Sequence, residues 1–177
     1  MTDAPRNLSD IRLLVVMGVA GCGKTTIGEH LAAAPTIDGT FLDGDAFHPQ
    51  ANIEKMSQGI ALTDEDRWPW LEIFGREIAA RSGTVIGGCS SLKRTYRDFI
   101  TQAAGEPVLF IYLNGSRELI ADRMGKREGH FMPTSLLDSQ FATLEVPAAE
   151  ECAIDVDIDA TTDEIVRRIQ SRLNGRH

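Results

Sequence analysis

Eight consecutive residues near the start of the chain have the types and spacing needed to hold a chain of phosphates. The segment GVAGCGKT occupies positions 18–25 and matches the pattern GxxxxGK[ST], between a short apolar run and a helical pattern. Its three glycines permit a tight curl with inward-turned backbone amides, and the following helix adds the positive end of its dipole. Lys24 then reaches the β and γ phosphates, and Thr25 offers a hydroxyl to Mg²⁺. The segment therefore predicts a site for a nucleoside triphosphate and its metal.

The alternative is a chance glycine turn, which the flanking strand and helix patterns disfavour. Cys22 has two open interpretations: the neighbouring amides and Lys24 lower the pKa of its thiol and make it oxidisable, or it is simply a small residue. The residues expected to bind the nucleotide are Gly18, Val19, Ala20, Gly21, Cys22, Gly23, Lys24, Thr25 and Thr26.

Two aspartates in the segment FLDGDAFHP, at positions 41–49, are candidates for metal and proton chemistry. Asp43 and Asp45 are two residues apart, so in an extended chain both face the same side. One carboxylate can help to hold hydrated Mg²⁺ while the other accepts a proton from a hydroxyl, as phosphoryl transfer requires. The alternative is an ordinary Asp-Gly turn.

Short apolar runs that alternate with helical patterns must position these residues. The expected strands are 11–17, 40–42, 84–89, 108–113 and 154–158. The expected helices are 23–33, 64–82, from Ser90 or Ser91 to 105, 116–127, 135–144 and 161–173, the last with a capping box of Thr161 and Glu164. This alternation predicts an α/β fold, with a mostly parallel five-stranded sheet and helices on both faces. Ligands then bind where strands end, after Met17, Leu42, Cys89 and Leu113.

Length and composition set further limits. The 177 residues predict one domain at 11–177 behind a polar extension at 1–10, and 42% hydrophobic with 25% charged residues disfavours disorder and fibrous structure. The net charge of -8 opposes binding to nucleic acid. No apolar run approaches the roughly 20 residues of a membrane span, and the polar start lacks a signal peptide, so we expect a cytoplasmic protein without membrane contact. Three scattered cysteines predict reduced thiols.

A longer stretch around the two aspartates resembles one particular family. FLDGDAFHPQANIEKMSQGIALTDEDRWPWL, at 41–71, is similar to the signature of gluconate kinases of the thermoresistant type. CSSLKRTYRD at 89–98, FIYLNG at 110–115 and HFMPTSLLDSQFATLE at 130–145 agree in order and spacing, so the resemblance covers nearly the whole chain. The long stretch DGDxxHPxxNIxKM separates this family from shikimate and adenylylsulfate kinases, which share the phosphate loop.

The resemblance implies a P-loop kinase fold like that of nucleoside monophosphate kinases. The implied reaction is ATP-dependent phosphorylation of D-gluconate on its terminal hydroxyl to 6-phosphogluconate, which feeds the pentose phosphate or Entner-Doudoroff route. By analogy with shikimate kinases, Asp43 falls on the metal side with Thr25, whereas Asp45 orients or deprotonates the attacking hydroxyl. The family also suggests a homodimer.

A polyol with a carboxylate needs cations for its acid group and hydrogen bonds for its hydroxyls. Arg67, Lys93 and Arg94 are candidates for the cations, and His48 is a candidate for the hydroxyls, since these residues lie in the matched segments. Their alternative role is a solvated helix surface. The adenine pocket is expected near 159–162, although no motif fixes it.

A mobile lid is expected at about 123–133. Arg123 and Arg127 are four residues apart and project from one helix face, and related kinases use such arginines to close over ATP. His130 lies in the same loop and is a further candidate for substrate binding. The alternative is an exposed basic stripe.

Three residues depart from the family pattern, because Gly87 and Gly88 replace larger apolar residues and Ser91 replaces alanine. The glycines are expected to leave room near the end of their strand. Three other functions remain as alternatives. A regulatory GTPase is disfavoured because the sequence has no NKxD segment to recognise guanine. The others are a kinase for another acceptor such as shikimate and a nucleotide-binding module without catalysis.

Overall fold

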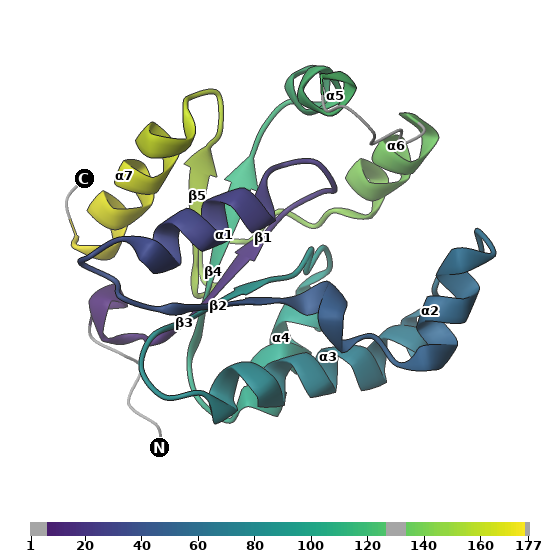
Figure 1. The fold of residues 1–177 in the computed structure, drawn as a ribbon, viewed down its shortest axis with the longest axis horizontal. Helices are drawn as coiled ribbons and strands as arrows, with labels where there is room; N and C mark the ends of the chain where they lie inside the picture. Colours follow the sequence, from purple (N-terminus) through teal and green to yellow (C-terminus); the bar gives the residue numbers. More distant parts are fainter. Residues whose placement is uncertain (1–6, 127–133, 176–177) are drawn as a thin grey trace.

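The computed structural model describes residues 7–126 and 134–175. In this part of the chain five parallel strands form one sheet in the order β2-β3-β1-β4-β5 (Figure 1). The strands are β1 (Leu13–Met17), β2 (Thr40–Asp43), β3 (Val85–Gly88), β4 (Val108–Asn114) and β5 (Ala153–Asp157). The five predicted strands and their parallel pairing are thus confirmed.

Helices cover both faces of the sheet. The α-helices are α1 (Lys24–Ala33), α2 (Gln50–Ser57), α3 (Asp64–Ala80), α4 (Arg94–Ala104), α5 (Arg117–Gly125), α6 (Thr134–Thr143) and α7 (Thr162–Leu173). Helices α1 and α7 lie on one face, and α3 and α4 pack together on the other (Figure 1). The predicted capping box of Thr161 and Glu164 is present at the start of α7. No helix in the described ranges is long and apolar enough to cross a membrane.

The central strand β1 is buried along its whole length because both of its faces are covered. Leu14 and Val16 belong to the core beneath α1 and α7, whereas Leu13, Val15 and Met17 belong to the core against α3 and α4. Burial on both faces is the physical reason why this strand reads as a continuous apolar run. The phosphate loop starts directly after the last residue of β1, Met17.

Helix α2 and a short 3-10 helix at Leu8–Asp10 are absent from the sequence expectations. Helix α2 escaped detection because its apolar residues do not face a core: Ile53 and Met56 are 46% and 44% exposed, and the buried residue is the polar Asn52. Leu8, within the segment expected to be a polar extension, packs against the core.

The expectation that Gly87 and Gly88 leave room at the end of β3 is wrong. The rings of Phe74 and Phe41 occupy that space: a Cβ on Gly87 would lie 2.5 Å from Phe74 Cζ, and one on Gly88 would lie 3.2 Å from Phe41 Cζ. The two glycines therefore accommodate aromatic side chains from α3 and β2.

Candidate active site

The phosphate loop curls between β1 and α1 and requires glycine at defined points. Gly21 has a φ of +81°, and a Cβ on it would lie 2.5 Å from the side chain of Met124. Gly23 caps α1 with a φ of +99° in the left-handed region, which favours glycine. Lys24 extends back over the loop, and its Nζ lies 3.1 Å from the carbonyl oxygens of both Gly18 and Val19. The amino group is thus held at the mouth of the curl.

Two distant segments fasten the loop from outside. The backbone N–H of Gly18 donates to the carbonyl oxygen of Ser90 at 3.2 Å. The backbone N–H of Ala20 donates to Oε1 of Gln140, on α6, at 2.6 Å. Sequence reasoning missed Gln140, because a lone glutamine on a helix gives no signal of a partner 120 residues away.

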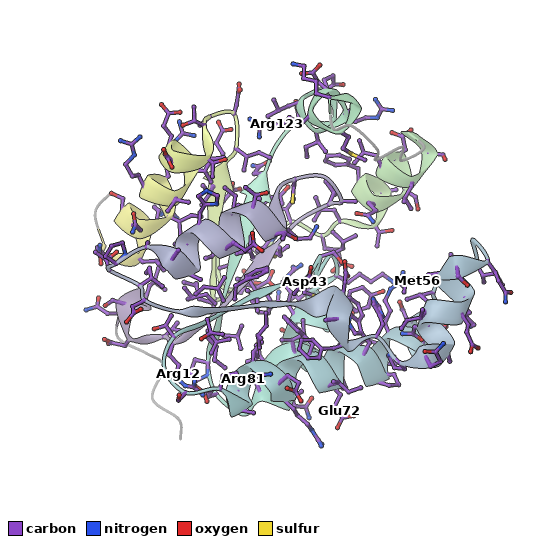
Figure 2. The ribbon with its side chains drawn as sticks, in the orientation of Figure 1. Arg12, Asp43, Met56, Glu72, Arg81 and Arg123 are labelled. Atoms are coloured by element: carbon purple, nitrogen blue, oxygen red, sulfur yellow. The ribbon has the colours of Figure 1, made fainter. Side chains whose placement is uncertain are left out.

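Asp43 is the last residue of β2 (Figure 2), and Asp45 lies in the turn that follows it. Asp43 Oδ1 accepts a hydrogen bond from the backbone N–H of Asp45 at 3.0 Å, which sets the turn between them. A cavity of about 150 Å³, here called the central cavity, is lined by both aspartates together with Lys24 and Thr25. The structure thus brings the predicted metal, proton and phosphate residues to one place.

The oxygen donors of this cavity suit the metal that the motif implies. A threonine hydroxyl and an aspartate carboxylate are hard ligands of the kind that Mg²⁺ takes alongside waters and phosphate oxygens. Thr25 and Asp43 are the two residues that supply them. Elsewhere in the described ranges, no three His, Cys, Asp or Glu residues gather into a metal-binding group.

A second cavity, of about 340 Å³ and here called the α7-side cavity, opens on the other side of the loop. Its lining includes Gly21, Thr26, Arg123 and the segment Ala160 to Thr162. Arg123 comes from α5 (Figure 2), and its Nη2 donates to the carbonyl oxygen of Ala160 at 3.2 Å. The segment expected to hold adenine and one predicted lid arginine therefore lie together next to the phosphate loop.

A larger pocket of about 550 Å³, here called the α2-side pocket, adjoins the central cavity. The two share Asp45, Ser90 and Gln140 in their linings. The α2-side pocket also includes His48 and Arg67, so three of the predicted substrate residues are brought together. Asp45 stands at the junction, with a side chain that is 87% exposed.

Arg67 is part of a charged cluster around Tyr96. Its Nη1 donates to the hydroxyl of Tyr96 at 3.2 Å and lies 3.5 Å from Asp64 Oδ1, and that hydroxyl in turn donates to Asp64. Lys93 reaches the same carboxylate at 3.2 Å, 5.5 Å from the centre of the aromatic ring. The Tyr96 hydroxyl and then Lys93 lower the pKa of Asp64. Lys93 thus belongs to the cluster that holds Arg67 and is absent from the pocket lining.

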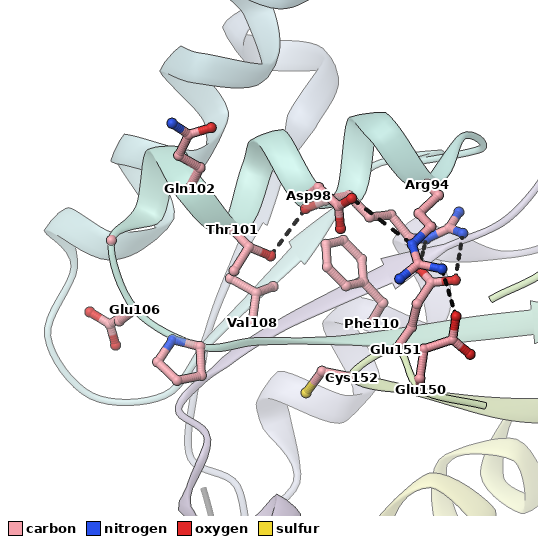
Figure 3. A pocket seen from close by; sticks show the side chains of 13 residues that line it. Arg94, Asp98, Thr101, Gln102, Glu106, Val108, Phe110, Glu150, Glu151 and Cys152 are labelled. Carbon is pink, nitrogen blue, oxygen red and sulfur yellow. Dashed lines mark hydrogen bonds and ion pairs between the residues drawn. The ribbon is translucent and has the colours of Figure 1, made fainter. Parts of the chain in front are cut away.

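Arg94 does not line the α2-side pocket. Its Nη1 lies 2.7 Å from Glu150 Oε1, and it lines a separate cavity of about 760 Å³ that runs along α4 (Figure 3). The prediction that it binds substrate gains no support from this position. Its neighbour Arg97 is 1% exposed and pairs with Glu151 at 2.8 Å. Arg97 also donates to the carbonyl oxygen of Ser91 at 2.9 Å, so it supports the loop after β3 from beneath.

His48 is held as part of a stack. Its ring lies 4.0 Å from that of Trp70 at an interplanar angle of 18°, and the indole N–H of Trp70 donates to the carbonyl oxygen of Gly44 at 2.8 Å. Burial lowers the pKa of His48, and Arg67 acts in the same direction while Asp45 opposes them. Sequence reasoning found His48 but missed Trp70.

Four residues singled out in the sequence remain to be placed. The structure describes two of them, Cys22 and Ser91. Burial raises the pKa of Cys22, so the position favours a small packed residue over a reactive thiol. Ser91 is buried with a φ of +48°, and its hydroxyl donates to the carbonyl oxygen of Cys89 at 3.2 Å. Arg127 and His130, with most of the expected lid, lie outside the described residues.

Three features together define a P-loop kinase. They are a phosphate loop after the first strand, an adjacent pair of aspartates, and a second pocket at the carboxyl edge of a parallel sheet. Solved structures of low identity share this fold, such as a shikimate kinase from Aquifex aeolicus with a TM-score of 0.60 and 15% identity over 92% of this chain and 96% of that one. A family model described as an AAA domain matches residues 13–147.

More similar proteins narrow the class. The chain is 46% identical over 170 residues to a gluconokinase from Gluconobacter oxydans, covering 90% of this chain and 92% of that one. It is 48% identical over 153 residues to the thermosensitive gluconokinase of Escherichia coli, covering 84% and 79%. A solved gluconokinase from Sinorhizobium meliloti has a TM-score of 0.84 and 45% identity over 96% of this chain and 94% of that one. The chain belongs to the gluconokinase family.

Proposed function

We propose that this chain catalyses the transfer of the γ-phosphoryl group of ATP to the terminal hydroxyl of D-gluconate, giving 6-phosphogluconate and ADP. The observation that carries the proposal is the position of Asp45. It lies where the central cavity, with Lys24 and Thr25, meets the α2-side pocket, with Arg67. Membership of the gluconokinase family supplies the acceptor, because the relatives with 46% and 48% identity carry that name.

The phosphate side of the reaction rests on the loop. Its backbone amides and Lys24 hold the β and γ phosphates and neutralise charge that grows during transfer. Thr25 and Asp43 hold Mg²⁺, which screens the phosphate oxygens when bound. Arg123, with the predicted lid residue Arg127, closes over the nucleotide and limits the entry of water. The adenine base lies in the α7-side cavity.

On the acceptor side, Arg67 offers a planar fork of N–H groups to the carboxylate of gluconate. His48 and the predicted lid residue His130 donate to hydroxyl groups. Asp45 orients the terminal hydroxyl and accepts its proton as the oxygen bonds to the γ phosphorus and the bond to the ADP oxygen breaks. Lys93 contributes indirectly, since it shares Asp64 with Arg67.

The experiment measures ADP release from Mg²⁺-ATP in a coupled assay. D-gluconate is compared with shikimate, adenylyl sulfate, nucleoside monophosphates and no acceptor. Turnover that depends on gluconate supports the proposal. Turnover with another acceptor alone would keep the phosphate chemistry and remove the assignment of Arg67, whereas no turnover with any acceptor would leave a nucleotide-binding module.

Exchange of Asp45 for asparagine sharpens the test. We expect Asp45→Asn to lower kcat by roughly 10²- to 10⁴-fold, the usual share of a general base, while ATP affinity changes by less than about twofold. The matched control is Asp98→Asn, which removes an exposed carboxylate on α4 and should leave both values unchanged. Unchanged turnover in Asp45→Asn would remove the residue from its role.

We also propose where the protein acts, what it binds and how it assembles. The protein acts in the cytoplasm on a small molecule, without nucleic acid or membrane, and it forms a homodimer. Light scattering coupled to size-exclusion chromatography tests the last of these, and a mass near 19.4 kDa would contradict it.

A further inference from the structure

The imidazole of His48 is held in position by its neighbours in the fold. Its side chain is 6% exposed, and the ring lies against Trp70, which is itself anchored by its bond to the carbonyl oxygen of Gly44. A half-turn of the ring would bring Cδ2 to the place of Nδ1, and the ring would have to break its stacking contact with the anchored indole to make that turn. The two nitrogens of His48 therefore face different and constant partners.

The partner of the inner nitrogen is the amide of Asn52, one helical turn further along. Asn52 Nδ2 lies 3.3 Å from His48 Nδ1 and 3.0 Å from the backbone carbonyl oxygen of Asp66, and Asn52 is 3% exposed. A carbonyl oxygen only accepts, so the amide nitrogen must be the atom that faces it. The same nitrogen carries a second hydrogen, which points at His48.

An amide nitrogen only donates, so Nδ1 of His48 must accept. A neutral imidazole carries its one hydrogen on the other nitrogen when the first accepts. The hydrogen is thus on Nε2, which lies 4.0 Å from Asp45 Oδ1 on the side of the α2-side pocket. A doubly protonated ring would turn two donors toward each other at Nδ1, and burial already lowers the pKa of His48.

We propose that Asn52 is a positioning residue that holds His48 in its neutral Nε2–H tautomer, so that the ring presents one N–H donor to the acceptor hydroxyl in the α2-side pocket, beside Asp45. The proposal rests on the proposed function only for the identity of that hydroxyl. With a single fixed donor, the imidazole orients the substrate oxygen without competing with Asp45 for the transferred proton. The charged groups that face the ring are Asp45, from the turn after β2, and Arg67, from α3.

The test reads the tautomer directly. Two-bond ¹H–¹⁵N correlation spectra distinguish the two tautomers and the imidazolium ion, and the chain has four histidines to assign. His30 is an internal reference of the opposite kind, because its Nδ1 lies 2.8 Å from the carbonyl oxygen of Thr26 and so must donate. We expect the Nε2–H pattern for His48 in the unmodified protein at neutral pH. An Nδ1–H or imidazolium pattern would overturn the proposal, whatever the enzyme assay gives.

The variant Asn52→Asp tests the role of the amide. A carboxylate accepts from Nδ1–H, so His48 should change to the Nδ1–H tautomer or to the imidazolium ion, while the signals of His30 stay unchanged. We expect kcat with gluconate to fall about 10-fold, with the KM for ATP within about twofold of its starting value. The control Asn174→Asp, at the exposed end of α7, should change neither spectrum nor rate. An unaltered His48 pattern in Asn52→Asp would contradict the proposal.

The same change in the variant His48→Gln distinguishes a role in positioning His48 from a general role in the stability of the fold. The side-chain amide of glutamine donates from one end whatever its neighbours, so in His48→Gln the further change Asn52→Asp should cost less than about twofold in kcat. An equal loss in both backgrounds would assign Asn52 a purely structural role. Should gluconate turnover be absent while the spectra agree with expectation, the proposed function fails and the tautomer assignment stands.

Discussion

The two sides of the site are built in opposite ways. On the nucleotide side, eight contiguous residues at the junction of β1 and α1 supply the loop. Its backbone amides and one lysine are the groups expected to bind the phosphates. On the acceptor side, the α2-side pocket takes single side chains from the turn after β2, from α2, α3, α4 and α6. Phosphate chemistry therefore depends on a local conformation, whereas acceptor recognition depends on how separate elements pack.

This difference explains how the two sides tolerate change. A local curl fails as a unit when its glycines or its lysine are replaced, since no neighbouring element substitutes for them. A pocket of separate side chains loses one contact at a time, with graded effects on the affinity for one ligand. Variants on the two sides should accordingly separate in both size and kind of effect.

The largest effect is expected on the nucleotide side. Lys24→Met should lower kcat/KM by on the order of 10³-fold, because the amino group stabilises charge that grows on the transferred phosphoryl group. The coupled ADP assay measures the loss. Arg76→Met, which removes an exposed cation on α3, is the charge-matched control and should retain full activity. A loss below tenfold in Lys24→Met would break the contrast between the two sides.

A smaller and selective effect is expected at Arg67. Arg67→Lys keeps the charge and removes the planar fork, so the KM for gluconate should rise roughly 10- to 100-fold, as expected for loss of charge-assisted hydrogen bonds. The KM for ATP should stay within about twofold. Initial-rate measurements with each substrate varied in turn provide the check, with Arg76→Lys as the control. An equal rise for both substrates would mean that Arg67 supports the fold more than the acceptor.

The smallest effect is expected at Gln140, which belongs to both sides. Gln140→Leu removes the acceptor of the Ala20 N–H bond and a polar group shared by the central cavity and the α2-side pocket. The KM values for ATP and gluconate should both rise, by about 2- to 10-fold, in keeping with one hydrogen bond. Gln170→Leu, which removes a side-chain bond to Thr36 between α7 and the segment after α1, is the matched control. A change confined to one substrate would show that the two sides are independent after all.

The same contrast decides what was predictable from the sequence. The phosphate loop, the five strands and the capping box at Thr161 follow local rules of spacing and residue type, and the structure confirms them. Asp45, His48 and Arg67 were expected at the acceptor because they lie in segments that match the family, and the structure brings them to one pocket. Their roles in the reaction remain predictions.

The unpredicted parts depend on packing over long range or on exposed surfaces. Gln140 on α6 and Asn52 on α2 are single polar residues, and helical spacing does not say which distant partner such a side chain meets. Arg94 has the sequence context of a substrate ligand but turns toward Glu150, a partner 56 residues away. The direction in which a long side chain leaves a helix is decided by such partners. The spacing of residues in the sequence does not reveal these partners.

The hydrogen bonds that fasten the phosphate loop impose an order on its assembly. The loop is finished early in synthesis, yet Gly18 bonds to Ser90 and Ala20 bonds to Gln140, 120 residues further along the chain. Strand β1 likewise waits for β3 and β4 before both of its edges are paired. Closing such long loops costs entropy that is recovered only when the later segments arrive. A nascent chain that already contains the complete motif therefore lacks both of these bonds until Ser90 and then α6 have left the ribosome.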